Sequence, residues 1–364
     1  MDRSLPVIHS RGAPFERGLH FGSEARDRVR RSATAYMEIF RREAGLSREA
    51  VFEQAERFLP VITASAPHLV EEMRGIAEGA GCHFYEIVAI NARTELMYGV
   101  TNAPECTSVA VGAAASVDGH VRLAQNWDWH PSLAGALALW SIARDDGPGL
   151  VTLAEAGIVG KIGMNAAGLA MCVNLLKSDD DNAGPAVPMH ILLRLVLEQA
   201  TNVQEAIDLI STTPRCTSCN HLLADRAGAI ADVEATPAGV QTLYPQNNIL
   251  AHSNHCLQSE LAAHDRYRRD YPETIRREKR MSALATGRVI DEASLRAMLA
   301  DHANAPYSIC LHNKAGWAFS EQAESVASII FDLTARTIDV ADGPPCEYEY
   351  RRVEHRVAAM EKTT

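Results

Sequence analysis

The spacing of apolar residues changes at Cys106, and this change constrains the fold more than any other feature. Before it, apolar residues recur three and four positions apart over residues 23–40, 48–58, 66–80 and 84–97, which predicts a layer of helices. From Cys106 onward the apolar runs become short, β-branched or alternating, and Gly, Asp and Pro separate them. Such runs are typical of antiparallel strands.

The rest of the chain alternates between strand and helix patterns. Strands are predicted at 106–113, 120–128, 137–143, 149–154, 168–175, 219–224, 229–234, 240–244, 248–252, 307–311, 325–332 and 337–340. Helices are predicted at 188–199, 203–210, 259–284 with a break at Pro272, and 291–301. This order favours two sheets packed face to face with helices outside, in the α+β class. Without a low-complexity linker or a repeat, residues 1–364 are predicted to form one domain.

Charge and apolar content exclude several classes of protein. The net charge of −11 argues against a nucleic-acid binder, because neutralising phosphates needs clustered positive charge. The basic residues from Arg266 to Arg280, Arg277 among them, are interspersed with acidic ones and predict a solvated helix surface. No uninterrupted apolar run has the length of a membrane span, and the first residues lack the apolar core of a signal peptide. We therefore expect a cytoplasmic protein without a membrane partner, with reduced thiols.

Common catalytic and metal-binding signatures are absent or weak. The chain has no phosphate-binding Gly-rich loop, no His-Glu-x-x-His helix and no Gly-x-Ser-x-Gly turn. Cys216 and Cys219 form a lone C-x-x-C pair, and a zinc site would need two further ligands. Cys310 and His312 would share one face of a strand, where either a nucleophilic pair or ordinary core and rim residues explain them. We therefore expect neither a metal nor a cofactor.

Cys106 itself is a candidate nucleophile. If the peptide bond between Glu105 and Cys106 is cut, one residue carries both a thiol and a free α-amine. The amine has a pKa near about 8, which suits it to accept the thiol proton. Position alone favours the alternative, an inert cysteine buried in a strand.

Two polar segments favour the catalytic interpretation. Asn126, Asp128 and His130 alternate along one strand, so a hairpin would bring their shared face beside the thiol. Asn254 ends another strand, flanked by Ser253 and His255, and its amide could donate to an oxyanion. The alternatives are a solvated strand end for the first segment and ordinary turn residues for the second.

In combination these segments resemble a known family. Residues 105–108 (Glu-Cys-Thr-Ser), 125–129 (Gln-Asn-Trp-Asp-Trp), 163–169 (Gly-Met-Asn-Ala-Ala-Gly-Leu) and 253–255 (Ser-Asn-His) are similar, in order, to motifs of the acyl-coenzyme A:6-aminopenicillanic acid acyltransferase family. These proteins are N-terminal-nucleophile hydrolases, so the resemblance implies a four-layer αββα sandwich of two antiparallel sheets. It also implies autocleavage before Cys106, with Cys106 as nucleophile, Asp128 assisting processing and orienting the new terminus, and Asn254 as oxyanion donor. The penicillin enzyme has Gly where this chain has Glu105.

The implied activity is hydrolysis or transfer of the acyl group of a small amide or acyl thioester, through a thioester on Cys106. The pieces 1–105 and 106–364 would remain together as a heterodimer, and a further oligomer is left open. A hypothesis from another class is an unprocessed, non-catalytic αββα protein that binds a small molecule or a partner. A third hypothesis is a metal hydrolase that uses Cys216, Cys219 and histidines.

Overall fold

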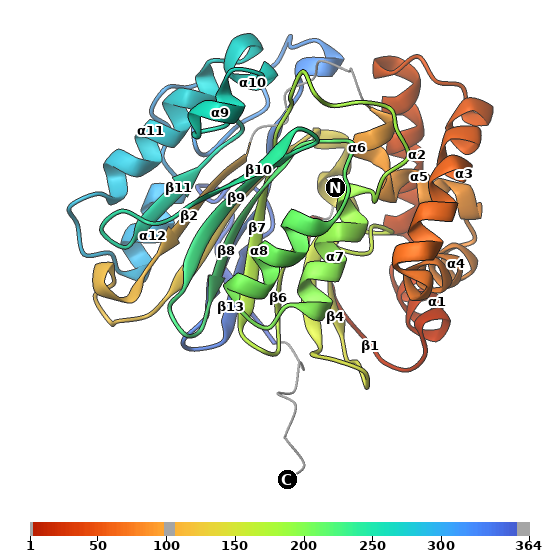
Figure 1. Ribbon diagram of the computed structural model, residues 1–364, viewed down its shortest axis with the longest axis horizontal. Coiled ribbons are helices and arrows are strands. Elements are labelled where there is room, and N and C mark those ends of the chain that lie inside the picture. Colours follow the sequence, from red (N-terminus) through yellow and green to blue (C-terminus); the bar gives the residue numbers. More distant parts are fainter. Residues whose placement is uncertain (1–2, 98–105, 355–364) are drawn as a thin grey trace.

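Two β-sheets face each other, and helices cover the outer face of each sheet (Figure 1). The computed structural model describes residues 3–97 and 106–354. Helices α1 to α8 lie on the side of the larger sheet, and α9 to α12 cover the smaller one. The predicted αββα layering is confirmed.

The lead segment is helical, as its apolar spacing predicts. The Ser47 hydroxyl caps α3 by accepting from the Ala50 N–H, and Pro67 and Pro14 begin α4 and α1, where a proline costs no hydrogen bond. Helix α1 begins before the predicted residue 23, and the chain breaks at Ala25 before α2. The helices are α1 (Pro14–Glu24), α2 (Arg26–Glu43), α3 (Arg48–Ser65), α4 (Pro67–Ala80), α5 (Phe84–Asn91) and α6 (Arg93–Leu96).

Four glycines let α1 and α4 pack backbone against backbone. Gly18 and Gly22 of α1 face Gly75 and Gly79 of α4, and a Cβ added at Gly18 would lie 2.0 Å from the carbonyl oxygen of Glu72. No side chain fits in that space. The two helices therefore form a close pair at the outer edge of the helical layer.

The larger sheet has eight strands in the order β1-β4-β5-β6-β7-β8-β9-β10. β1 pairs parallel with β4, and the other neighbours are antiparallel. Helices α7 (Met189–Gln199) and α8 (Val203–Thr212) pack on its outer face. The short β1 and β6 were not predicted. The strands are β1 (Val7–Ser10), β4 (Leu137–Ile142), β5 (Leu150–Glu155), β6 (Ile162–Asn165), β7 (Leu169–Leu175), β8 (Cys219–Asp225), β9 (Ile230–Thr236) and β10 (Gly239–Leu243).

The smaller sheet has six strands in the order β11-β2-β3-β12-β13-β14, so the strand that begins at Cys106 is interior. All its pairings are antiparallel. The strands are β2 (Cys106–Val111), β3 (Arg122–Trp129), β11 (Ile249–His252), β12 (Glu324–Asp332), β13 (Thr337–Ala341) and β14 (Arg351–Val353). The predicted helix 259–284 is divided, with the expected break at Pro272, into α9 (Ser259–Ala262), α10 (Arg266–Asp270) and α11 (Glu273–Ala285), and α12 (Glu292–Leu299) follows.

The predicted strand at 307–311 is wrong, because these residues form no strand. The Leu311 N–H donates to the Ser325 hydroxyl at 3.0 Å, and the Ser325 N–H donates to the Leu311 carbonyl at 2.9 Å. A side-chain oxygen thus supplies a bond that a strand ladder would otherwise make. The apolar run is buried as a loop against the end of β12.

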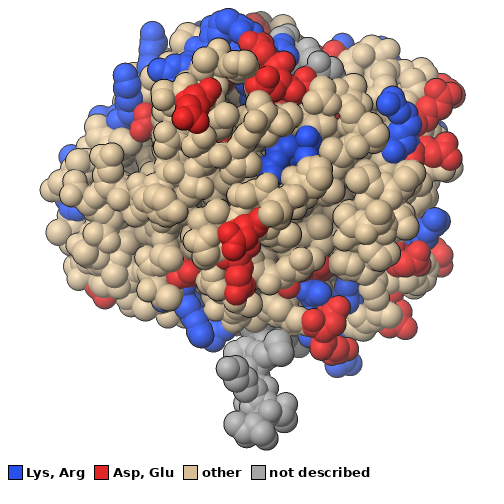
Figure 2. Space-filling view, in the orientation of Figure 1, with Lys and Arg blue, Asp and Glu red and all other residues tan. Residues whose placement is uncertain are grey.

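Positive and negative side chains are interspersed on the face seen in Figure 2. On the basic segment, Arg269 pairs with Asp179, and Arg280 pairs with Asp301. The mixed-sign surface predicted there is confirmed for these residues, and Arg277 is an exception that is described below. Among the helices of residues 3–97 and 106–354, none combines the length and apolar character that crossing a membrane requires.

Candidate active site

Cys106 is the first residue of β2 and pairs with Trp127 of β3. Residues directly opposite in an antiparallel pair share a face, so the thiol lies with the Trp127 indole between the two sheets. Asn126 pairs with Thr107 and lies on the other face. The prediction that the Asn126 face lies beside the thiol is therefore wrong by one register position.

The backbone of Cys106 is held by two side chains from outside its own hairpin. Its N–H donates to Oδ1 of Asn254 at 2.6 Å, and Nη1 of Arg277 donates to its carbonyl oxygen at 2.8 Å. Nη1 of Arg277 also donates to the Thr107 hydroxyl at 3.1 Å, and Nη2 donates to Oδ1 of Asn254 at 3.2 Å. These bonds fix the start of β2 through both backbone polar groups of Cys106.

Asn254 lies just after β11, with its side chain against the backbone N–H of Cys106. Its Nδ2 donates to the Leu175 carbonyl at 2.9 Å, which engages one of the two amide N–H groups. The flanking Ser253 and His255 do not reach the thiol. The Ser253 hydroxyl donates to the Thr274 carbonyl at 2.8 Å, and Nδ1 of His255 lies 3.3 Å from the Thr274 hydroxyl. Burial lowers the pKa of His255 to about 3, so a neutral ring supports the turn into α11.

Asp128 reaches the site through its backbone and its charge. Its carbonyl oxygen lies 3.9 Å from Sγ of Cys106, and its Oδ1 accepts from the Ser325 hydroxyl at 2.6 Å. The side chain is completely buried. The predicted cleavage position also involves Glu105, which lies outside the described residues.

Asn126 and His130 serve the scaffold. Nδ2 of Asn126 donates to the carbonyls of Leu299 at 2.7 Å and Ile309 at 2.9 Å, which ties the end of α12 and the 309–311 loop to β3. Nδ1 of His130 accepts from the N–H of Ser132 at 3.2 Å and caps the short 3₁₀ helix that follows. The structure does not bring either side chain to the thiol.

A cluster of buried charges lies on the thiol's own face and was missed in the sequence. Nζ of Lys161 lies 3.4 Å from the centroid of the Trp127 ring and 3.4 Å from Oε2 of Glu155. Arg93 lies 3.6 Å from Oε1 of the same carboxylate, which also accepts from the Tyr36 hydroxyl at 2.5 Å. Two cations therefore share one carboxylate beside the nucleophile candidate.

The pKa values of this cluster follow from burial. Burial raises the pKa of the Cys106 thiol to about 11 and Asp128 adds to the shift, while Lys161 and Arg277 oppose it. Burial lowers the pKa of Lys161 to about 7, against the attraction of Glu155. In the intact chain the thiol is therefore protonated at neutral pH, and Lys161 changes charge in that range.

Arg277 is the main residue that the sequence interpretation misplaced. Its side chain is completely buried, although it was predicted to lie on a solvated surface. The available signal was the helical spacing, because Thr274, Arg277, Met281 and Ala285 recur three and four apart and form the buried face of α11.

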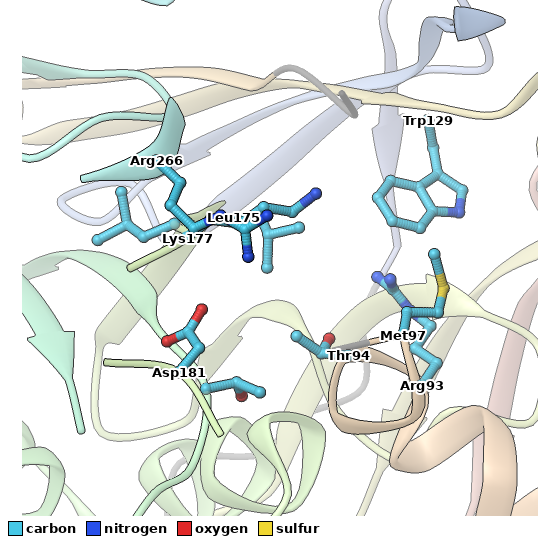
Figure 3. A pocket seen from close by; sticks show the side chains of 10 residues that line it. Arg93, Thr94, Met97, Trp129, Leu175, Lys177, Asp181 and Arg266 are labelled. Carbon is cyan, nitrogen blue, oxygen red and sulfur yellow. The ribbon is translucent and has the colours of Figure 1, made fainter. Parts of the chain in front are cut away.

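A narrow cavity of about 30 Å³ adjoins the site (Figure 3). Trp129 follows Asp128 in β3, and Leu175 accepts the bond from Asn254, so these two residues connect the cavity to the nucleophile candidate. In volume it holds about one or two waters. Its lining combines apolar and charged side chains, namely Arg93, Thr94, Met97, Trp129, Leu175, Leu176, Lys177, Asp181, Thr217 and Arg266.

Two groups of metal-ligating residues occur in the described part of the chain, and neither contains Cys216 or Cys219. The first is Asp232, Glu234 and His252. Nε2 of His252 lies 3.0 Å from Glu234, and the nearby carboxylates outweigh burial and raise the pKa of His252 to about 9. This group is therefore explained as a buried ion pair. The second group is taken up below.

Comparisons with known proteins agree with this architecture. The model of the family described as acyl-coenzyme A:6-aminopenicillanic acid acyl-transferase matches residues 116–346. A protein of Emericella nidulans, acyl-coenzyme A:6-aminopenicillanic-acid-acyltransferase 40 kDa form, is 28% identical over 343 residues, which cover 93% of this chain and 92% of that protein.

Among solved structures, penicillin V acylase from Agrobacterium tumefaciens matches with a TM-score of 0.50 and 16% identity, over 71% of this chain and 89% of that one. A conjugated bile acid hydrolase from Clostridium perfringens gives a TM-score of 0.48 and 13% identity, over 68% and 92%. The predicted N-terminal-nucleophile hydrolase fold is confirmed. The chain belongs to the acyl-coenzyme A:6-aminopenicillanic acid acyl-transferase family.

Proposed function

We propose that this chain is an autoprocessed cysteine enzyme that hydrolyses or transfers the acyl group of a small amide or acyl thioester. One observation carries the proposal: the N–H of Cys106 donates to Asn254 while Arg277 holds its carbonyl. A nucleophile whose own amine is to act as base needs that nitrogen fixed in place. Membership of an acyltransferase family supports the reaction class.

Autocleavage begins with attack of the Cys106 sulfur on the carbonyl carbon of Glu105. The carbon–sulfur bond forms, the Glu105–Cys106 carbon–nitrogen bond breaks, and the thiol proton passes to the departing nitrogen. Water then opens the thioester, which restores the thiol and leaves a carboxylate on Glu105. The products are residues 1–105 and 106–364, held in one αββα unit by the layers described above.

In turnover, the α-amine of Cys106 takes the thiol proton, and the sulfur attacks the substrate carbonyl. Nδ2 of Asn254 donates its second N–H to the oxyanion, and the amine returns the proton to the leaving group. Water or an amine then takes the acyl group from the sulfur. A single oxyanion donor of this kind is worth about 3 kcal/mol.

The cavity beside the site suggests the substrate class. At about 30 Å³ the cavity admits water and not an acyl chain, so only the charges on its lining bear on the substrate, and Arg93 and Arg266 are positive. Asp181 lies on the same lining, and burial raises the pKa of its carboxyl to about 6. We therefore propose an acyl substrate that carries an anionic group. The Emericella nidulans relative is named for a substrate that is an acid.

Mass measurement under denaturing conditions tests the proposal. The wild-type chain should give two fragments with the masses of residues 1–105 and 106–364, and Cys106→Ala should remain one inactive chain. Cys172→Ala is the matched control, because Cys172 is another buried strand thiol in the same core. An unbroken wild-type chain whose Cys106→Ala variant keeps acyl-transfer and amidase activity would contradict the proposal.

The rival function, an unprocessed binding protein, predicts a different result. The chain would stay in one piece, and a thiol reagent would leave Cys106 unlabelled. A panel of acyl thioesters and amides, followed with water and with an amine as acceptor, separates hydrolysis from transfer.

A further inference from the structure

Two cysteines and two histidines from separate segments converge behind the sheet that carries Cys106. Cys310 and His312 belong to the loop that replaces the predicted strand, His302 follows α12, and Cys346 follows β13. Their ligand atoms all lie within 4.8 Å of one another. Together they offer the Cys₂His₂ set of structural zinc sites.

The spacing of the ligand atoms is close to that of tetrahedral zinc, although two of the four distances are slightly shorter. Sγ of Cys310 lies 3.5 Å from Sγ of Cys346 and 3.7 Å from Nε2 of His312. Nε2 of His312 lies 3.2 Å from Sγ of Cys346 and 3.1 Å from Nε2 of His302. Zinc–sulfur and zinc–nitrogen bonds of about 2.3 and 2.0–2.1 Å place tetrahedral ligand atoms about 3.3–3.8 Å apart. We propose that these four residues bind one structural zinc ion.

A carboxylate behind the cluster supports a metal. Nε2 of His312 faces the other ligands, and its Nδ1 lies 3.4 Å from Oε1 of Glu347. Metal-ligating histidines usually give their second ring nitrogen to such a carboxylate, which fixes the tautomer and the ring orientation. The loop is also held in place, because the Cys310 N–H donates to the Asp301 carbonyl at 3.0 Å.

A disulfide between the cysteines explains less of the arrangement. The two sulfurs are 3.5 Å apart, far beyond the bond length of about 2.05 Å. A disulfide would also give no reason for two imidazole nitrogens to face the sulfurs. Cys310 is buried and Cys346 is exposed, so an ion can enter from the solvent side and still be anchored in the core.

Four protein ligands leave no open position, so the ion would stabilise the fold and would not bind substrate. Within the ligand loop, the Leu311 N–H donates to the Ser325 hydroxyl, and this hydroxyl donates to Asp128. The ion would therefore fix the loop that supports this candidate catalytic carboxylate. The proposal differs from the expectation that the chain binds no metal and that Cys310 and His312 are a nucleophilic pair or ordinary core and rim residues. It does not depend on the proposed acyl chemistry.

Metal analysis of the full chain tests the site. The protein, without a histidine tag, is reduced, loaded with zinc and desalted, and about one equivalent of zinc should remain. Cys346→Ser should lose it, and so should His312→Ala. Cys82→Ser is the matched control, because Cys82 is also accessible and lies outside the cluster. It should keep the ion.

Cobalt loading adds a spectroscopic measurement. Wild type and Cys82→Ser should show the charge-transfer and ligand-field bands of tetrahedral cobalt with thiolate ligands, and Cys346→Ser should not. Circular dichroism separates loss of the ion from loss of the fold. A reduced wild-type chain that retains no zinc overturns the proposal, as does a folded Cys346→Ser variant that retains as much as wild type. A chain isolated with a Cys310–Cys346 disulfide that takes up no zinc after reduction also overturns it.

Discussion

Two regions of this protein bury several charges, and they compensate them very differently. One lies between α1, α4 and α7, around Arg194. The other lies between the sheets, around Lys161 and Cys106. Both exclude solvent, so the contrast comes from how each charge is paired.

Around Arg194 the pairing is nearly complete. Its guanidinium contacts Glu72 at 2.9 Å, Glu198 at 2.8 Å and the Val159 carbonyl at 2.7 Å. Glu198 also bonds His68 at 2.7 Å. Against burial, Arg194 and His68 lower the pKa of Glu198 to about 2. The charged forms are therefore the stable ones, as in a structural network.

Around Lys161 the pairing is incomplete. Arg93 and Lys161 share the single carboxylate of Glu155, and burial lowers the pKa of Lys161 to about 7. A side chain whose pKa is shifted toward neutral pH by burial, and which lies beside a potential nucleophile, is typical of active sites. Burial alone therefore does not distinguish the candidate active site from the structural network. Burial with too few partners does.

Replacing Cys106, the proposed nucleophile, should give the largest effect. Cys106→Ala should abolish both chain cleavage and acyl transfer, because no other thiol has its backbone held by Asn254 and Arg277. The measurement is fragment mass together with turnover. Cleavage in this variant would remove Cys106 from the active site and, with it, the functional half of the comparison.

Replacing the side chains that hold the Cys106 backbone should give the second-largest effect. Asn254→Ala and Arg277→Lys should each lower turnover about 100-fold or more, since each removes a donor or acceptor at the reacting residue. Unchanged circular dichroism shows that the fold is intact. Near-normal kcat in Asn254→Ala would exclude it as the oxyanion donor.

Breaking the network around Arg194 should lower the stability of the protein. Glu198→Gln should lower the free energy of unfolding by roughly 3 kcal/mol near neutral pH, the equivalent of a pKa lowered from 4.5 to about 2. Because the native pKa is depressed, this contribution is complete above about 4.5 and is lost as the pH falls toward 2. Denaturant unfolding at several pH values measures it.

The exposed Glu53→Gln is the control and should change stability little. If Glu198→Gln instead lowers kcat without loss of stability, the distinction between the two regions fails.

Lys161 should give the smallest effect, confined to pH dependence. At a pH below its pKa of about 7, the charged amine of Lys161 lowers the pKa of the Cys106 thiol. At a higher pH the amine is neutral and no longer lowers it. Lys161→Met should therefore slow labelling of Cys106 about tenfold below pH 7 and remove an inflection near that pH. Lys161→Arg, which stays charged, should remove the inflection without the loss of rate. Identical pH profiles would show that the cluster does not act on the thiol.

Much of the fold was predictable because the spacing at which apolar residues recur differs between a helix and a strand. The lead helices, the break at Pro272 and most strands follow the predicted positions. The 307–311 loop could not be distinguished from a strand, because the same apolar run fits both. The sequence does not show whether its backbone N–H groups bond to a neighbouring strand or to the Ser325 side chain. The short β1 and β6 carry too few residues to show a period.

The site was predictable only in part. Cys106, Asp128 and Asn254 were proposed because Cys106 begins a predicted strand and the other two lie in polar segments near the ends of strands. The structure places the Cys106 N–H against Asn254 and the Asp128 carbonyl oxygen 3.9 Å from the sulfur. Arg277 was assigned to the surface because its neighbours in sequence are charged, although helical spacing places it on the buried face of α11. The partners of Lys161 come from distant elements, so their meeting depends on tertiary packing that no local pattern contains.

The position of β2 between β3 and β11 has a consequence in time. Asn254 follows Cys106 by 148 positions and Arg277 by 171, so the residues that hold the nucleophile leave the ribosome long after it. At about 5–20 residues per second, the first delay is roughly 7–30 s. A nascent chain cannot assemble the proposed cleavage site during that interval. Autocleavage would therefore begin only after the second half of the protein has been synthesised and has folded against the first.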